Sequence, residues 1–487
     1  MGNDRKKFIT DTFLSSFPPL AGLLSSFVIM IFITKFIGVA GYGIWAQFQI
    51  TFSLLSLFLC LNLGSSIGRF LAGEKEKEYL GKVFYSVIAS VLILTILAGL
   101  FFYIFKESLA NFLFGEKELG IIIILLIIFL IFRNLSRQCQ HLLMARRYIK
   151  EWTLINLGIF GAAAVLVVLT TMATKNIVAS IFAFVVVEGI ALAILSGFIW
   201  QKGIRPVKPD FGSIVPLLKF GVPLIMTGIG YWIIQSSDRY LIKYFLDISQ
   251  VGLYSVGYSC AFTLIFLWTA FSGVILPDLS ALFDKGKIRE LEIRFSRVLK
   301  YGVAFSVPGV IGLSILAKPI IKTLSSSEFL PAANVLIIIS VGVFFYGMFV
   351  HFNTLLSVLK KVKILSSIWI LMAVFNLGLN FWLIPKFGII GAAASTSLCF
   401  LLGAVVIVLY SQNYFKIVFQ KEWLAKIIIA STLMGILISL ITVTSKICLI
   451  LTILTGALIY GATLLLLKFY DQSELSLFGK IFLKSKR

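Results

Sequence analysis

Charged residues are scarce in this sequence of 487 residues. Only 13% of the residues are Asp, Glu, Lys or Arg, about half of the fraction found in soluble domains, and 59% are hydrophobic. A water-soluble protein of this length could not bury so much apolar surface in one core. The composition therefore excludes a soluble protein and indicates an integral membrane protein.

Histidine and cysteine are also rare. The chain has 2 His and 5 Cys, and no two cysteines have the CxxC spacing of a metal or redox site. No nucleophile motif, glycine-rich phosphate loop or large hydrophilic segment with clustered carboxylates is present. We therefore expect neither an enzyme nor a metal site, and no bound cofactor.

Acidic residues are half as numerous as basic ones, 21 against 43, which gives a formal net charge of +22. The basic residues form short clusters that separate apolar runs, the pattern of loops that face the cytoplasm. Nucleic-acid binding would need a basic face on a soluble module, and no stretch has that character. The basic excess therefore predicts a membrane orientation and contacts with anionic lipids.

Long apolar runs fill most of the chain, and a membrane-spanning helix needs roughly 20 such residues. The sequence predicts an all-α polytopic membrane protein of about fourteen transmembrane helices joined by short connections. The expected spans are 14–34, 43–66, 82–105, 119–143, 152–173, 177–199, 214–236, 251–275, 299–317, 332–358, 364–384, 388–410, 424–443 and 447–467.

The basic clusters orient these spans. With a cytoplasmic N-terminus, every inside segment has more Lys and Arg than its outside neighbours, from Arg5–Lys7 at the start to the basic tail after Lys468. The N-terminal segment lacks a small-residue cleavage pattern, so we expect no cleaved signal peptide. The protein is therefore predicted to be a multi-pass protein of the cytoplasmic membrane with both termini cytoplasmic.

The first and seventh predicted spans are similar. Phe17-Pro18-Pro19-Leu20 opens one and Gly221-Val222-Pro223-Leu224 opens the other, and each continues to a similar glycine and aromatic segment. Copies separated by six spans start on the same side of the membrane, which predicts a parallel repeat. We expect two pseudo-symmetric six-helix bundles around a central cavity, residues 1–200 and 201–415, followed by two extra helices and a basic tail in 416–487.

Four short motifs resemble those of one known family. Asp238-Arg239-Tyr240-Leu241-Ile242 with Val251-Gly252-Leu253-Tyr254-Ser255 is similar to its "DR-x-(I/L)-(I/L) … VG-x-YS" stretch. Ile384-Pro385-Lys386-Phe387-Gly388 with Ile389-Ile390-Gly391-Ala392-Ala393 resembles its "IP-x-(Y/F)-GI-x-GAA" turn. Leu276–Ser280 and Gly38–Gly43 look like two further motifs, in the family's order and spacing.

The family is that of the Wzx-type lipid-linked oligosaccharide flippases, within the MOP superfamily that also holds lipid II flippases and MATE drug exporters. The resemblance implies a MATE-like fold that translocates a polyprenyl-diphosphate-linked glycan by alternating access. It also implies membrane lipids and the glycosyltransferases or polymerase of the same pathway as partners. Fourteen spans are similar to the lipid II and sporulation branches, but the eighth span lacks the arginine of lipid II flippases.

The fourth span carries the strongest candidate for head-group binding. Arg133, Arg137 and His141 recur every four residues, so they lie along one helix face. Arginine binds phosphate oxygens in a bidentate manner, and this stripe would suit a diphosphate. The alternative is that the span ends early and these residues lie at the membrane interface. Arg69 and Lys35, which end the second and first spans, are further cavity candidates or interfacial side chains.

Glu188 lies midway along the sixth span without a charged neighbour in the sequence. A carboxylate there is expected to be protonated or to pair with a basic residue of another helix. It is the candidate for coupling to a proton or sodium gradient, and a structural ion pair is the alternative.

Asp238 and Arg239 are adjacent near the outer end of the seventh span, and are structural or gate candidates. Neighbours in a helix diverge by about 100°, so we expect them to pair with other helices rather than with each other. His351 and Asn353 in the tenth span are candidate sugar contacts, as are Asn376 and Asn380 in the eleventh. Hydrogen bonds that join helices would explain them equally well.

A MATE-like cation-coupled multidrug exporter is the alternative function on the same fold. Such a protein binds cationic drugs, so acidic residues should dominate the spans, whereas here Arg133 and Arg137 stand against Glu188. The sequence therefore favours the glycolipid flippase.

Overall fold

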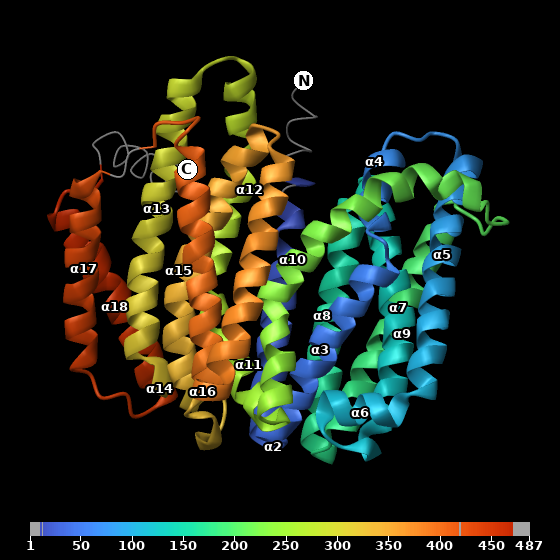
Figure 1. Cartoon of the computed structure of the whole chain (residues 1–487), viewed down its shortest axis with the longest axis horizontal. Helices are drawn as coiled ribbons and strands as arrows, with labels where there is room; N and C mark the ends of the chain where they lie inside the picture. Colours follow the sequence, from blue (N-terminus) through green and yellow to red (C-terminus); the bar gives the residue numbers. More distant parts are fainter. Residues whose placement is uncertain (1–9, 12, 418–419, 471–487) are drawn as a thin grey trace, which may run out of the picture. The chain divides into compact units, whose positions relative to one another are not determined.

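The computed structural model describes residues 10–11, 13–417 and 420–470, and these residues form α-helices and short 3-10 helices without a β-strand (Figure 1). Twelve of the described helices are long and apolar enough to cross a membrane. A helix satisfies its backbone hydrogen bonds internally, as the hydrocarbon of a bilayer requires. The prediction of an all-α polytopic membrane protein is confirmed. The basic residues Arg5–Lys7 and those after residue 470 lie outside the described residues.

Two regions account for the difference between these twelve helices and the fourteen predicted spans. α16 (Val362–Ser411) combines the predicted spans 364–384 and 388–410 across a kink at Gly388, where φ is 58° and ψ is −140°. The predicted span 251–275 is shared by two successive helices, α11 (Ile248–Phe262) and α12 (Ile265–Asp284). Every predicted span is therefore largely helical, although 424–443 extends beyond the helix Lys421–Ser439, and the exact count depends on how these breaks are treated.

The chain divides into two compact units, Met1–Ser255 and Val256–Arg487. In the first unit the central helix α7 packs against α3, α4, α5 and α9, α2 lies along α8, and α10 contacts α3, α4 and α6. The helices of this unit, apart from the start of α11, are α2 (Phe17–Phe36), α3 (Val39–Leu59), α4 (Leu63–Phe70), α5 (Lys77–Ile104), α6 (Lys106–Phe114), α7 (Gly120–Ala145), α8 (Ile149–Thr174), α9 (Ile177–Gln201) and α10 (Val215–Phe245).

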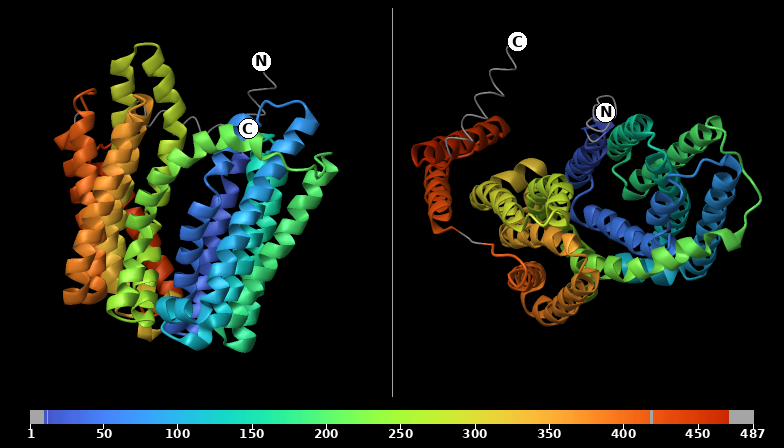
Figure 2. Two further views of the ribbon diagram at one scale, coloured as in Figure 1. Left: turned by 45° about the vertical axis from the view of Figure 1, so that its right-hand side comes forward. Right: turned by 90° about the horizontal axis from the view of Figure 1, so that it is seen from above.

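In the second unit the central helix is α15, which packs against α12, α13 and α16. The pair α17–α18 packs on α13, at the edge of the unit (Figure 2, right). The helices that follow α12 are α13 (Ile288–Ile315), α14 (Ala317–Leu324), α15 (Ala332–Val358), α16, α17 (Lys421–Ser439) and α18 (Lys446–Leu466). The predicted division at residues 200 and 415 stays a prediction, while the contacts of α10 group this helix with the first unit.

The same order of elements occurs once in each unit. α5 and α13 have 28 residues each, and a short helix follows both, α6 with 9 residues and α14 with 8. A three-residue 3-10 turn comes next, Lys117–Leu119 or Ser327–Phe329, and then a central helix, α7 or α15. The order of these elements thus repeats once after the first predicted span and once after the seventh.

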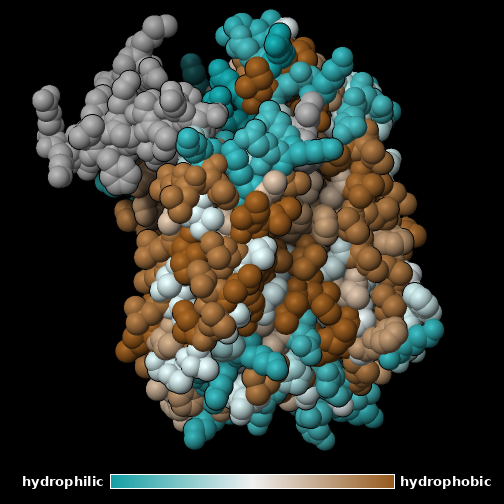
Figure 3. Space-filling model, turned by 90° about the vertical axis from the view of Figure 1, so that its left-hand side faces the viewer, coloured by the Kyte–Doolittle hydropathy of each residue, from teal (hydrophilic) through white to brown (hydrophobic). Residues whose placement is uncertain are grey.

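The outer face of the second unit is apolar where it carries α17 and α18. Exposed apolar side chains on these helices include Ile436, Ile450, Leu454 and Leu458. The space-filling view of this side shows a broad hydrophobic zone with hydrophilic residues above and below it (Figure 3). A band of this kind fits contact with lipid tails, as the composition predicts.

The connection from α9 to α10 is fixed by polar contacts at the end of α5. The ammonium group of Lys82 lies 3.1 Å from Oδ2 of Asp210, and the Asp210 N–H donates to Oγ of Ser86 at 2.7 Å. The hydrogen bond from Lys82 holds the pKa of the exposed Asp210 carboxyl below its usual value. Asp210 also accepts the Gly212 N–H at the start of the 3-10 turn Phe211–Ile214.

Two glycines allow the backbones of α3 and α11 to touch. A Cβ atom at Gly43 would lie 2.0 Å from the carbonyl oxygen of Ile248, and one at Gly252 would lie 2.2 Å from that of Val39. Side chains of any size would force the helices apart. The glycines of the Gly38–Gly43 and Val251–Ser255 motifs therefore have a packing role.

Gly252→Ala should lower the stability of the purified protein, because overpacking costs about 1–3 kcal/mol. The measurement is the thermal unfolding midpoint in detergent. Gly158→Ala is the matched control, since Gly158 is also helical but has no atom within 4 Å of its would-be Cβ. Equal midpoints for the two variants would contradict the close contact of α3 and α11.

Candidate functional site

An ion pair joins α7 to α9 in the interior of the first unit. NH1 of Arg133 donates to Oε1 of Glu188 at 2.8 Å, and the side chain of Glu188 is 2% exposed while that of Arg133 is 25% exposed. A buried carboxylate needs such a partner, because an isolated charge in a low dielectric is costly. Of the two states expected for Glu188, the structure shows the paired one. Its role in ion coupling stays a prediction.

The two helices are close beside this pair because of Gly189. A Cβ atom at Gly189 would lie 3.0 Å from the ring of Phe132. Phe132 directly precedes Arg133 in the sequence, and Gly189 directly follows Glu188. A small residue at 189 thus lets α7 and α9 approach until the guanidinium reaches the carboxylate.

Aromatic rings pack together one helical turn from the pair. The ring centroids of Phe129 and Phe184 are 4.9 Å apart, and these residues lie one helical turn before Arg133 and Glu188. From α3, Trp45 lies 5.2 Å from Phe184 and Phe48 lies 5.3 Å from Phe129. These rings form an apolar layer between α3, α7 and α9 one helical turn from the ion pair, and a low dielectric nearby strengthens electrostatic attraction.

Other polar groups are buried on the same three helices. The Ser56 hydroxyl donates to Oδ1 of Asn134 at 2.7 Å, which links α3 to α7. Among the described residues, several buried polar atoms have no hydrogen-bond partner. On these helices they are both side-chain polar atoms of Gln47, Nδ2 of Asn134, Oγ of Ser136, Oε1 of Gln138, Nε2 of Gln140 and Oε2 of Glu188. Most buried polar groups are satisfied, so this set marks an interior that can accept water or a polar ligand.

Arg137 and His141 continue the face that begins at Arg133. Arg137 is exposed and His141 is partly buried. His141 packs against α4, where a Cβ atom at Gly64 would lie 2.2 Å from its ring. The three side chains therefore lie along one face of α7, as predicted, but their surroundings differ. Arg133 is paired with Glu188, Arg137 is exposed, and His141 packs against α4.

Arg69 lies on α4 beside α10. Its guanidinium carbon is 4.5 Å from the ring centroid of Phe220, close enough for a cation–π contact. The hydroxyl of Ser66 donates to the Leu217 carbonyl at 2.8 Å, so two side chains of α4 reach the first turns of α10. Arg69 is thus placed on a helix contact and not on the α7 face. Lys35 is exposed in the last turn of α2.

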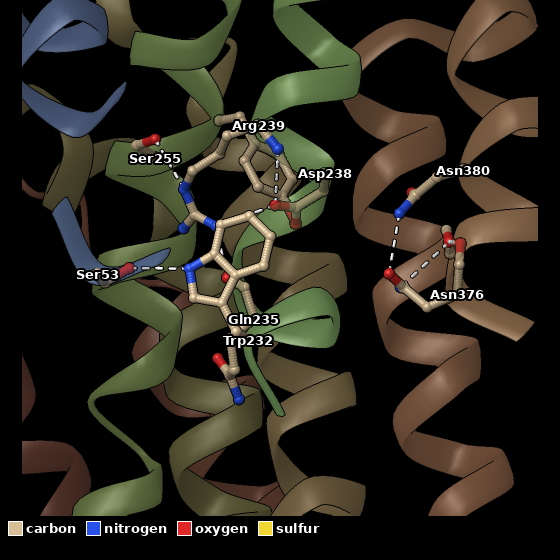
Figure 4. A network of polar contacts seen from close by, with 10 residues as sticks. Ser53, Trp232, Gln235, Asp238, Arg239, Ser255, Asn376 and Asn380 are labelled. Atoms are coloured by element: carbon tan, nitrogen blue, oxygen red, sulfur yellow. Dashed lines mark hydrogen bonds and ion pairs between the residues drawn. The ribbon is translucent and has the colours of Figure 1, made fainter. Parts of the chain in front are cut away.

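Asp238 and Arg239 form a buried network with α11 (Figure 4). NH1 of Arg239 lies 3.0 Å from Oδ1 of Asp238, Nε of Arg239 donates to Oγ of Ser255 at 3.2 Å, and the Tyr254 hydroxyl donates to Oδ2 of Asp238. The expectation that the two residues would not pair with each other is wrong. The arginine side chain folds back toward the carbonyl of Gln235, at 2.7 Å, and so passes the neighbouring carboxylate. The contacts with Tyr254 and Ser255 agree with the expected anchoring to another helix.

His351 is enclosed in the second unit. It is 0% exposed, its ring is stacked on Phe295 with centroids 4.1 Å apart, and its Nε2 lies 3.3 Å from the Phe295 carbonyl. The ring of Trp268 lies on another side at 5.9 Å. In this structure His351 is therefore a packing residue of the α12–α13–α15 core. Its neighbour on the same helix, Asn353, has a buried Oδ1 without a hydrogen-bond partner.

Asn376 and Asn380 hydrogen bond within α16. Nδ2 of Asn380 donates to Oδ1 of Asn376 at 3.0 Å, and the Ser395 hydroxyl donates to the Asn376 carbonyl at 3.2 Å (Figure 4). Ser395 lies beyond the Gly388 kink, so these bonds tie the two halves of the helix together. In the described ranges no group of three or more His, Cys, Asp and Glu could hold a metal ion.

The buried aromatic rings and Gln47 were not singled out from the sequence. A polar residue inside an apolar run marks Gln47, and the four-residue spacing from Phe129 to Arg133 and from Phe184 to Glu188 could have linked the rings to the pair. Nothing in the sequence indicates which helix supplies the partner of Glu188.

Relatives in sequence include two proteins of Haloferax volcanii. The "Probable low-salt glycan biosynthesis flippase Agl15" is 27% identical over 263 residues, which cover 53% of this chain and 56% of that protein. The "Probable flippase AglR" is 27% identical over 175 residues, which cover 35% of this chain and 36% of that protein. The chain thus spans about half or less of the length of these relatives.

Solved structures share the fold. The lipid II flippase MurJ, in its inward closed conformation, is similar with a TM-score of 0.75 at 19% identity, over 93% of this chain and 98% of that chain. An inward-facing multidrug resistance MATE family transporter of the MOP superfamily is similar with a TM-score of 0.67 at 13% identity, over 83% and 97%.

A family model described as "Polysaccharide biosynthesis protein" matches residues 32–334, which is more than half of the chain. The match spans both units and includes α7, α9 and α10. The shared fold agrees with the MATE-like architecture predicted from the sequence. This chain belongs to the polysaccharide biosynthesis protein family.

Proposed function

We propose that this protein moves a polyprenyl-diphosphate-linked oligosaccharide from the cytoplasmic to the outer leaflet of the cytoplasmic membrane. Its family is one of polysaccharide biosynthesis, and two relatives are named as probable flippases, one of them for glycan biosynthesis. Its role is translocation and not catalysis, in a pathway whose glycosyltransferases or polymerase supply and use the glycan. The positive-inside pattern of Lys and Arg supports cytoplasmic termini.

The cationic face of α7 is the observation that carries this proposal. Arg137 is exposed on a helix that is apolar enough to span a membrane, one turn from the ion-paired Arg133. A charged residue in such a place is costly unless it meets water or an anionic ligand. The diphosphate of a lipid-linked glycan is an anion of the geometry that guanidinium groups bind well.

Alternating access would require α10 to separate from its neighbours at one end at a time. At its first turns, α10 is held by Ser66 and Arg69 of α4. Near its last turns the Tyr240 hydroxyl lies 2.8 Å from Oγ1 of Thr51 of α3. Midway, Trp232 donates to Oγ of Ser53 at 2.9 Å (Figure 4). We propose that the contacts of Ser66 and Arg69 with α10 break when the protein opens toward the cytoplasm. The contact of Tyr240 with Thr51 would break when it opens toward the outside.

A MATE-like drug exporter is the second candidate, because Glu188 is a buried acidic residue of the kind that binds organic cations. In this chain, however, the carboxylate already has a cationic partner. Transport of organic cations without transport of glycolipids would support the drug exporter function.

Arg137→Glu should reduce flipping at least tenfold, because the head group then meets a like charge, and Arg133→Ala with Arg137→Ala should abolish it. The measurement uses purified protein in proteoliposomes with a fluorescent polyprenyl-diphosphate oligosaccharide, whose leaflet is read with an impermeant quencher. Arg289→Ala with Lys446→Ala is the control, since it removes two cations outside this face.

Wild-type rates in Arg137→Glu would move the head-group site away from α7. Absence of glycolipid flipping by the wild type under proton and sodium gradients, together with export of cationic dyes, would overturn the proposal in favour of the exporter.

A cysteine placed at Ser66 should report the opening of α10 from α4. Ser66 is 0% exposed, so labelling of Ser66→Cys by N-ethylmaleimide should be slow. Adding Gly221→Ala should accelerate it at least fivefold, the factor that corresponds to about 1 kcal/mol of overpacking. The reason is that a Cβ at Gly221 would lie 2.8 Å from the Leu61 carbonyl and 3.1 Å from Oγ of Ser66.

Peptide mass spectrometry measures this labelling, and the native Cys139 serves as an internal control. Cys139 is 3% exposed within α7 and should stay protected in both variants. Gly161→Ala, which adds a methyl group where no atom lies within 4 Å, should not change the rate. If Gly221→Ala also leaves the rate unchanged, α4 and α10 do not form a gate.

A further inference from the structure

Arg133 is held by Glu188 and is also part of the face proposed to bind the substrate. The pair is asymmetric: the carboxylate is 2% exposed, whereas the guanidinium is 25% exposed. An incoming anion can therefore reach Arg133 but not Glu188. Any anion that takes full bidentate hydrogen bonds from Arg133 competes with the bond from NH1 to Oε1 of Glu188.

Arg133 is the cation that stabilises the Glu188 carboxylate in this structure. Among the described residues its single ion-pair contact is with Arg133, and its second oxygen, Oε2, is buried without a hydrogen-bond partner. A carboxylate left in that position would be an uncompensated buried charge, and such groups neutralise by binding a proton. Pairing with Arg133 and binding a proton are thus alternative states of this side chain, and loss of Arg133 favours the protonated state.

The helices packed against α9 are α3, α7 and α8. α3 has Tyr42 as its titratable residue, and α8 has Lys150 and Glu151 in its first turn, at the helix end. α7 has Arg137, Cys139 and His141 besides Arg133. Arg137 is one turn further along and exposed, and His141 is packed on α4, so neither replaces Arg133 at Glu188.

The side of α9 that faces α8 is apolar. Val187 and Ala191, on either side of Glu188 in the sequence, pack with Ile159 and Ala163 of α8. A proton bound by Glu188 is therefore shielded on this side.

We propose that Arg133 and Glu188 form an ion pair that the substrate displaces, so that binding of a diphosphate head group is coupled to uptake of one proton by Glu188. This inference rests on the proposed function. In the empty state Arg133 is paired with the Glu188 carboxylate. In the loaded state Arg133 donates to the diphosphate oxygens, and an O–H bond forms between a proton from water and Glu188. The proton offsets one of the negative charges that the substrate brings into the membrane.

The coupling has a definite sign. A proton is bound when the ligand binds, so affinity rises as the pH falls, by up to about tenfold for each pH unit. When the diphosphate leaves, Arg133 returns to the carboxylate and the proton is released. If Glu188 releases its proton on the outer side, one proton moves outward with each glycolipid. If Glu188 releases it only after the protein has returned to its inward-facing state, no net proton movement results.

The experiment measures proton uptake directly. Geranylgeranyl diphosphate binds to the purified full-length protein in a calorimeter, in two buffers that differ in ionisation enthalpy, at pH 7 to 8.5. The diphosphate itself exchanges protons, so the informative quantity is the difference between wild type and Glu188→Gln. We expect the wild type to take up about one proton more than the variant. We also expect Glu188→Gln to bind at least tenfold more tightly at the highest pH, since Arg133 is then free.

Two further variants are controls, one for the loss of a carboxylate elsewhere in the protein and one for the loss of the ion pair. Glu118→Gln removes an exposed carboxylate at the end of a connection and should keep the wild-type proton count. Arg133→Gln with Glu188→Gln replaces the pair by two amides of similar size. It should bind weakly and without the extra proton.

Equal proton counts in wild type and Glu188→Gln, or weaker binding by a folded Glu188→Gln, would overturn the inference and leave the proposed function intact. An extra proton that persists in the double variant would overturn it as well, because another group would then carry the proton. If the wild type binds no diphosphate at all, the proposed function fails, and the inference fails with it.

Discussion

The exclusion of water from the bilayer core is the constraint on which this structure depends. It requires that backbone groups bond within helices and that a charge in the interior finds a partner. The kink at Gly388 is a departure from helical geometry within one of the long helices, and hydrogen bonds of Asn376, Asn380 and Ser395 lie around it. Polar side chains thus accompany the place where the helix is interrupted.

The same constraint separates the ionisable residues into two groups. Glu188 and Asp238 are buried, and each has an arginine beside it, Arg133 and Arg239. Arg69 and Arg137 are exposed and belong to no such pair among the described ion pairs. Buried pairs hold helices together, and exposed cations are available to a ligand. Arg133 belongs to both groups, because it is buried enough to need Glu188 and exposed enough to meet an anion.

Hydropathy alone predicted the helices, since spans such as 152–173 and 177–199 coincide with α8 and α9. The contacts between side chains of different helices depend on distances in space, which the hydrophobic periodicity of the sequence does not predict. The sequence left Glu188 either protonated or paired and did not indicate Arg133 as its partner, because the pairing depends on the close approach of Phe132 to Gly189. The pairing of Asp238 with Arg239 was missed because it depends on the rotamer of a long side chain. His351 was placed among sugar contacts, but Phe295 and Trp268, distant in sequence, enclose it.

The repeated order of elements allows the side chains of α7 to be compared with those of α15. α7 and α15 occupy the same place in the two copies, after a 28-residue helix, a short helix and a 3-10 turn. α7 carries Arg133, Arg137 and His141, whereas α15 carries His351 inside an aromatic core, with Gly347 leaving room for the Trp268 ring. A backbone arrangement that occurs twice cannot by itself account for a site that occurs once. The difference lies in side chains, and the proposed anion-binding site therefore lies in the first copy, where the cationic face of α7 and the ion-paired Glu188 of α9 are on adjacent helices.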